Sequence, residues 1–317
     1  MSAEFKAAGQ AASYAQHKPS TSGRCASIEW PTMALIALCF GAWVLATTWI
    51  AGHSTLAAIT IIAIAVALHS SLQHEALHGH PTRKRWLNEA LVFPALSLLI
   101  PYGRFRDTHL DHHRDPLLTD PYDDPETNYL DPAVWHRLPR WKQAVLRFNN
   151  TLLGRILLGT TVSQTAFMAS DWRAIRAGDA KVLNAWLWHI LAVALVLLWL
   201  VTIGKMAIWT YAIAAYAGLS LIKIRTFLEH RAHEDSRART VIIEDQGPLA
   251  FLFLNNNLHA VHHDSPGVPW YALPPLYAAN RDSYQRSNGG YVYRSYAQVA
   301  RQFLLHRKDP VAHPFWR

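Results

Sequence analysis

Cysteine is scarce in this chain of 317 residues, which contains only Cys25 and Cys39. Two thiols without a ligand-like pattern exclude a disulfide framework and an iron–sulfur site. The sequence also lacks a glycine-rich nucleotide-binding loop and a fused haem module. Residues 1–30 are polar and lack the compact apolar core of a cleavable signal peptide, so we expect a loose cytoplasmic tail.

Charge is also scarce, at 16% of residues, and four stretches are almost free of it: 33–50, 55–72, 186–203 and 206–222. Each is close to the ~20 residues that cross a bilayer core, and short connections join them in two pairs. They are apolar on every side, which favours lipid over the alternative of two buried hairpins in a soluble bundle. The sequence therefore predicts an all-α membrane protein with four transmembrane helices in two hairpins.

The basic residues predict the orientation of these hairpins. Of 30 Lys and Arg, three precede the first stretch, fourteen lie between the pairs, twelve follow from Lys223 onward, and only Lys205 lies at a hairpin tip. By the positive-inside rule both termini are cytoplasmic and the tips face outward. The net charge of +8 then reflects orientation and contact with headgroups, and no nucleic-acid partner is predicted, because no binding motif accompanies it.

Histidine is abundant, and eight of the 18 histidines fall in three short boxes on the predicted cytoplasmic side. The boxes are His74 and His78; His109, His112 and His113; and His259, His262 and His263. On a helix, residues three and four apart share a face, so each box is expected to aim its imidazoles at one point. Neutral imidazole binds iron, copper, zinc and nickel, and eight are too many for one tetrahedral zinc. We therefore predict two metal ions.

Other histidines are interpreted differently. Four that stand alone are expected to be ordinary core residues: His53, His189, His306 and His313. His69 lies five residues before His74 and should point away from the box, and His80 precedes Pro81, where the helix should end. We expect neither to bind metal, with His80 as the closer alternative.

Three further stretches flank the boxes. The segment 87–100 is short and interrupted by Pro94, which predicts an interfacial or re-entrant piece. Between Arg114 and Arg140 lie six carboxylates, typical of a solvated loop, with docking of a basic redox partner or metal binding as alternatives. The segment 141–170 predicts one or two amphipathic helices on the membrane face.

The three boxes, their order after paired apolar stretches, and the ending H-H-D-x-P-x-x-P-W-Y-x-L-P resemble the membrane fatty acid desaturase superfamily, which includes hydroxylases and carotenoid ketolases. The resemblance implies a membrane domain at 31–275, with a cytosolic histidine-box cap, and a cytoplasmic tail at 276–317. It also implies two iron ions that activate O₂ and oxidise an unactivated C–H bond of a lipid chain. Because the sequence shows no redox module of its own, a separate electron donor is implied, either a ferredoxin or a cytochrome with its reductase.

Fatty acyl desaturation is the preferred reaction. A hydroxylase or ketolase acting on a lipid, alkane or carotenoid is the first alternative, because the short H-x-x-x-H box occurs in all three groups. A membrane metal transporter or sensor is an alternative of another class, although transport requires ionisable residues within the spans, which are nearly absent here.

A ninth ligand is expected at His230, which follows the fourth apolar stretch and resembles a Glu-His pair of superfamily hydroxylases. His233 is the competitor on nearly the same face, and the third reading is that both are surface residues. Asn255, Asp264 and Glu75 are candidates for supporting roles: Asn255 to hold a metal-bound water, and the two carboxylates to orient ligand imidazoles. Helix capping and turn formation are the alternative for Asn255 and Asp264.

Overall fold

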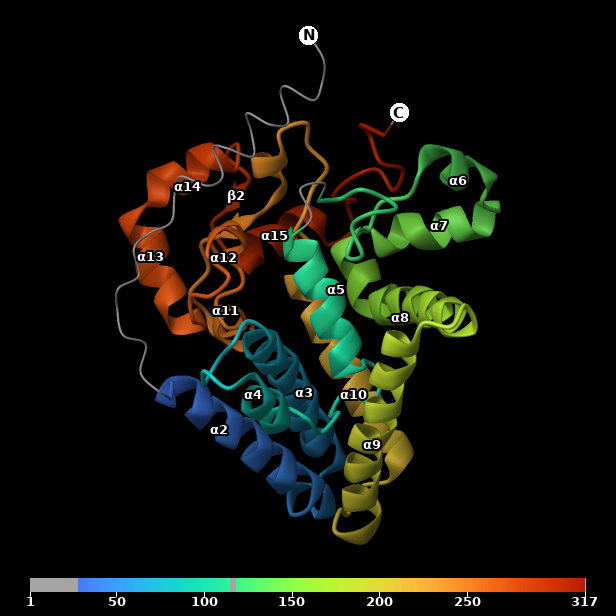
Figure 1. The fold of residues 1–317 in the computed structure, drawn as a ribbon, viewed down its shortest axis with the longest axis vertical. Coiled ribbons are helices and arrows are strands. Elements are labelled where there is room, and N and C mark those ends of the chain that lie inside the picture. The colour runs from blue at the N-terminus through green and yellow to red at the C-terminus, as the bar shows by residue number, and fades with distance from the viewer. Residues whose placement is uncertain (1–27, 115–117, 317) are drawn as a thin grey trace.

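Four long helices form the apolar half of the molecule, at the bottom of Figure 1. The structure is a computed structural model that describes residues 28–114 and 118–316; most of the expected tail at 1–30 lies outside these residues. The four helices are α2 (Trp30–Thr47), α3 (Thr55–Leu77), α9 (Ala180–Thr202) and α10 (Ile208–Arg225). The 3₁₀ turn η1 (Ile50–Gly52) joins α2 to α3, and all four predicted stretches are helical.

Three of these helices, among the described residues, are long and apolar enough to cross a membrane: Trp30–Gly52, Thr55–Leu77 and Ala180–Thr202. The fourth, α10, is shorter and ends in Lys223 and Arg225. Much of α10 is buried by protein, because it packs along α3. This contact is close: a Cβ at Gly218 would lie 2.6 Å from the Val66 Cβ and 2.7 Å from the Ala63 carbonyl oxygen. Small residues permit such an approach between helices.

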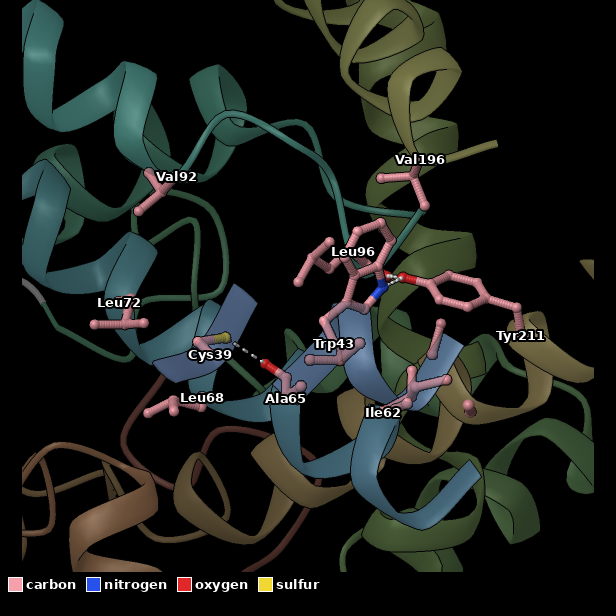
Figure 2. Packing of buried hydrophobic residues seen from close by; sticks show 14 of the residues in the cluster. Cys39, Trp43, Ile62, Ala65, Leu68, Leu72, Val92, Leu96, Val196 and Tyr211 are labelled. Carbon is pink, nitrogen blue, oxygen red and sulfur yellow. Dashed lines mark hydrogen bonds between the residues drawn. The ribbon is translucent and has the colours of Figure 1, made fainter. Parts of the chain in front are cut away.

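The interior of this half contains residues from all four long helices (Figure 2). The Trp43 indole N–H donates to the Tyr211 hydroxyl at 3.0 Å, and that hydroxyl donates to the Leu96 carbonyl at 2.9 Å. Between α9 and α10, the Lys205 N–H donates to the carbonyl of Thr47, the last residue of α2, at 2.8 Å. These buried polar groups are thus paired within the protein, as a medium without water requires.

The predicted interfacial piece is mostly irregular. Helix α4 (Arg85–Leu91) ends before Pro94, and residues 92–101 then run between the long helices. The Ala95 N–H donates to the Ala192 carbonyl at 3.3 Å, and the Leu98 carbonyl contacts His189 Nε2 at 3.1 Å. Protein groups thus satisfy part of this non-helical backbone, and its interfacial or re-entrant placement stays a prediction.

The polar half of the molecule begins with four helices of 6 to 25 residues. Helix α5 (Tyr102–Arg114) runs through the middle of Figure 1, and beyond it follow α6 (Pro132–Arg137), α7 (Arg140–Asn149) and α8 (Leu152–Arg176). Helices α7 and α8 cover the segment 141–170, which was predicted to be helical. Trp141 is 65% exposed and Trp172 is 61% exposed, so both helices present aromatic side chains outward.

The C-terminal part is folded against this half. Its elements are η2 (Ser236–Arg239), β1 (Ile242–Ile243), α11 (Pro248–Leu252), α12 (His259–Asp264), η3 (Trp270–Ala272), α13 (Leu273–Ala279), α14 (Arg281–Ser287), β2 (Val292–Tyr293) and α15 (Tyr296–Phe303). Strands β1 and β2 pair in parallel, so the described residues are mostly helical but not wholly so. Tyr296, Val299 and Phe303 are buried in one cluster with Phe227 and Phe253. Residues 276–316 therefore pack into the fold rather than extend as a tail.

Candidate metal centre

Cluster one brings together five imidazoles from three helices. Its members are His74, His78, His109, His113 and His262, and one nitrogen from each lies within 4.8 Å of the others. His74 and His78 stand one turn apart at the end of α3, as do His109 and His113 at the end of α5. The close contacts join His113 Nε2 to His109 Nε2 at 3.0 Å and to His262 Nε2 at 3.1 Å.

Cluster two contains four imidazoles, again with one nitrogen from each within 4.8 Å of the others: His112, His230, His259 and His263. His230 Nε2 lies 2.9 Å from His112 Nε2 and 3.0 Å from His259 Nε2. The His263 ring stacks on His113 of cluster one, with centroids 4.2 Å apart. The two clusters are therefore direct neighbours.

The second and third boxes are each divided between the clusters. Residues that are adjacent on a helix point about 100° apart, because a turn takes 3.6 residues. His112 accordingly faces cluster two while its neighbour His113 faces cluster one. In the same way, His263 faces cluster two and His262 faces cluster one. The expectation that each box aims at one point was wrong for these two boxes, and the split is what creates two clusters.

The inward-facing nitrogens are better suited to bind cations than to form hydrogen bonds with one another. The buried Nε2 atoms of His74, His78 and His263 have no hydrogen-bond partner. Where two Nε2 atoms meet at about 3 Å, at most one proton can be shared between them. Orphaned buried polar atoms are costly, and a metal ion would satisfy them. The donor set, nine imidazoles without cysteine or carboxylate, suits iron, copper, zinc or nickel.

Burial keeps most of these imidazoles neutral. It lowers the pKa of His230, His259, His262 and His263 well below the usual value, and neighbouring histidines lower it further. Neutral imidazole is the form that binds metal. His112 differs: burial lowers its pKa, but the carboxylates of Glu126 and Asp124 outweigh burial and raise the pKa to about 9. Negative charge that favours a proton there also favours a metal cation.

Two carboxylates of the acidic loop between Arg114 and Arg140 accept hydrogen bonds from clustered histidines. The sequence analysis did not predict these contacts. The His112 Nδ1–H donates to Asp124 Oδ1 at 2.7 Å, and the His109 Nδ1–H donates to Glu126 Oε1 at 2.9 Å. Asp124 is only 3% exposed. These contacts fix the rings and leave Nε2 free to face inward. This loop was expected to be solvated. Its position directly after the second histidine box was the sequence feature that could have predicted its contacts with the histidines.

Asn256, the residue after Asn255, contacts a clustered histidine. Its Oδ1 lies 3.2 Å from His259 Nδ1, and its amide donates to Glu229 Oε1, also at 3.2 Å. Asn255 has a positive φ of 56° and donates to the Trp270 carbonyl at 3.0 Å, which fits its alternative role in a turn. The helical spacing used to place Asn255 does not apply, because α12 begins only at His259.

The other supporting carboxylates also contact different partners. Asp264 accepts from the Tyr284 hydroxyl at 3.3 Å, and Glu75 Oε2 accepts from the Trp270 N–H at 3.2 Å. Glu229 lies closer to the clusters: its Oε1 pairs with Arg225 at 3.1 Å, accepts from the Asn256 amide and lies 3.9 Å from His259 Nδ1.

His80 and His233 lie outside both clusters. The buried His80 places Nδ1 2.7 Å from Glu29 Oε1, and His233 Nδ1 accepts from the Asp235 N–H at 3.0 Å at the protein surface. His230, by contrast, is held by a short antiparallel bridge to Thr240, and its carbonyl accepts from Lys308 Nζ at 3.0 Å. The geometry therefore favours His230 over His233 as the ninth ligand.

Comparison with known proteins agrees with this arrangement. No curated protein matches the chain. The family model described as "Fatty acid desaturase" matches residues 47–295, which is most of the chain and includes all nine clustered histidines. The chain therefore belongs to the fatty acid desaturase family.

Proposed function

We propose that this protein is an O₂-dependent, di-iron oxidoreductase that desaturates the acyl chain of a membrane lipid. The observation that carries the proposal is the pair of adjacent histidine clusters, with five and four inward-facing nitrogens. Family membership supports oxidation of a lipid as the reaction class. Two iron ions, when bound, supply the redox chemistry needed to break an unactivated C–H bond, which zinc cannot supply.

The residues of the chain have separate roles in this proposal. One ion would be held by His74, His78, His109, His113 and His262, and the other by His112, His230, His259 and His263. Asp124 and Glu126 orient ligand rings by accepting their Nδ1–H groups. Buried apolar residues around α3 and α10 exclude water from the side on which an acyl chain would approach.

The proposed topology has four spans, with α10 as the fourth and the clusters on the cytoplasmic side. It rests on the basic residues, 29 of 30 of which lie outside the hairpin tips. Reporter fusions after Arg317 and at Gly52 should report opposite sides of the membrane. If both report the same side, the four-span topology fails.

The reaction is tested by profiling the lipids of a host with and without the expressed chain. New double bonds, absent with a His259→Ala variant of equal abundance, are the expected result. New hydroxyl or keto groups would replace desaturation by the hydroxylase or ketolase alternative. Unchanged lipids in cells whose protein contains iron and receives electrons would contradict lipid oxidation altogether.

A further inference from the structure

The C-terminal strap, defined here as residues 304–313, follows α15 and lies beyond the part of the chain that the family model matches. It is non-helical, and backbone bonds fix it at both ends. The Leu153 N–H on α8 donates to the Leu304 carbonyl at 3.0 Å. The Leu130 N–H in the acidic loop donates to the Val311 carbonyl at 2.9 Å. The strap is therefore a defined part of the fold.

Lys308 of the strap turns its side chain into the protein. The side chain is only 4% exposed, and its Nζ donates to the His230 carbonyl at 3.0 Å. The Asp309 carboxylate lies 3.4 Å from the same Nζ, and the ring centroids of Tyr129 and Phe227 each lie 5.9 Å away. A buried ammonium group is costly unless it is paired. Here one of the groups that it pairs with is the backbone of a proposed metal ligand.

His230 lacks a support that two other members of cluster two have. His112 Nδ1 contacts Asp124, and His259 Nδ1 contacts Asn256. The buried Nδ1 of His230 has no hydrogen-bond partner among the described residues. Metal-binding histidines are almost always oriented through this second nitrogen. The orientation of the His230 ring therefore depends on how its backbone is held.

The strap also holds the backbone of this segment at a second point. The Tyr129 hydroxyl accepts from the Ala232 N–H at 2.9 Å and donates to the Asp309 carboxylate of the strap. Tyr129 belongs to the acidic loop, which also orients other clustered histidines. The strap, the acidic loop and the segment of His230 thus meet at one place.

We propose that Lys308 is a positioning residue, which holds the backbone of His230 so that its imidazole binds the metal ion of cluster two. The inference rests on the part of the proposed function that places one metal ion in each cluster. It gives the strap a role in metal binding, although the strap lies outside the region that the family model matches.

Titration with Co²⁺, which accepts imidazole ligands, tests the proposal without measuring activity. The unmodified protein in detergent, freed of metal, should bind two Co²⁺ ions. Lys308→Met keeps much of the side chain's length but removes its charge and its donor. It should weaken one Co²⁺ site by about 10–100-fold and leave the other unchanged. Arg307→Met, at the exposed preceding residue, is the matched control and should bind both ions normally.

A double-variant cycle identifies the residue through which Lys308 acts. Three imidazoles of cluster two remain in His230→Ala, so weak binding of Co²⁺ there stays measurable. Adding Lys308→Met to this variant should cause no further loss, because the residue that Lys308 positions is already absent. Adding it to His78→Ala, which lacks a member of cluster one, should leave both sites weakened.

Three results would overturn the proposal. The first is full affinity at both sites in folded Lys308→Met. The second is equal weakening of both sites in that variant, which would indicate a general loss of structure. The third is a further loss of Co²⁺ binding when Lys308→Met is added to His230→Ala.

A second variant decides the question if Lys308→Met does not fold. Tyr129→Phe removes the hydroxyl that holds the Ala232 N–H, and it should weaken the same Co²⁺ site. Tyr122→Phe removes an exposed hydroxyl that donates to Asp131, and it should bind both ions normally. Normal binding by Tyr129→Phe would then exclude positioning by the strap. An unmodified, folded protein that does not bind two Co²⁺ ions would contradict the proposed function itself, and this inference with it.

Discussion

The two histidine clusters are built in different ways. Cluster one takes four of its five histidines as one-turn pairs at the ends of α3 and α5, so regular helices position it. Cluster two combines one residue of α5, two of the short α12, and His230 on a non-helical bridge. It therefore depends on contacts between distant segments, including Asp124, Glu229, Asn256 and Lys308.

This difference predicts that the two clusters lose metal binding in response to different substitutions. A rigid helix end tolerates the loss of one neighbour, whereas a site assembled from loops depends on each contact that orders them. Changes outside the ligand set should therefore affect cluster two more than cluster one.

The largest effect is expected from His230→Ala, because among the described residues His230 is the member of cluster two that the bridge segment contributes. The variant should lose metal from one site and all product formation. His233→Ala, three residues further on, should retain both. Metal analysis and lipid profiling in the same membranes measure this, and loss of both properties only in the His233 variant would reverse the assignment.

The second-largest effect is expected from Asp124→Asn. This change weakens the acceptor that orients His112 but keeps the size of the side chain. Supporting residues of this kind typically contribute about 10–100-fold in metal affinity or activity. Asp123→Asn, one residue earlier and exposed, is the matched control and should behave as the unmodified protein. A similar loss in both variants would assign the effect to the loop as a whole.

Glu126→Gln should have a smaller effect of the same kind. The Glu126 side chain is 28% exposed, against 1% for Asp124, so water can compete for its hydrogen bond to His109. Titration of the purified variants with ferrous iron compares their affinities. A larger loss for Glu126→Gln than for Asp124→Asn would contradict the difference drawn between the clusters.

The same difference explains what the sequence could predict. The four apolar helices and the i, i+4 pairs of cluster one follow from local periodicity. The contacts of Asp124, Glu126 and Asn256 with the clustered histidines do not, because each depends on an approach between residues that no local pattern encodes. The helical spacing assumed for Asn255 has the same limit, because Leu254 and Asn255 lie in a turn and both have positive φ.

The smallest effect is expected in the apolar half. Gly218→Ala forces α10 away from α3, and overpacking of this kind costs about 1–3 kcal/mol. Gly41→Ala on α2 is the control, because a Cβ there meets nothing within 4 Å. Thermal unfolding in detergent should show a lower midpoint only for Gly218→Ala. Equal midpoints would show that α3 and α10 are not tightly packed.

The central claim is that the two clusters hold two iron ions. It is tested most directly by measuring the metal content of the purified, folded protein. The account predicts about two irons per chain, a count that follows from two adjacent sets of imidazole nitrogens too numerous for one ion. A folded protein that contains one zinc and no iron would contradict it.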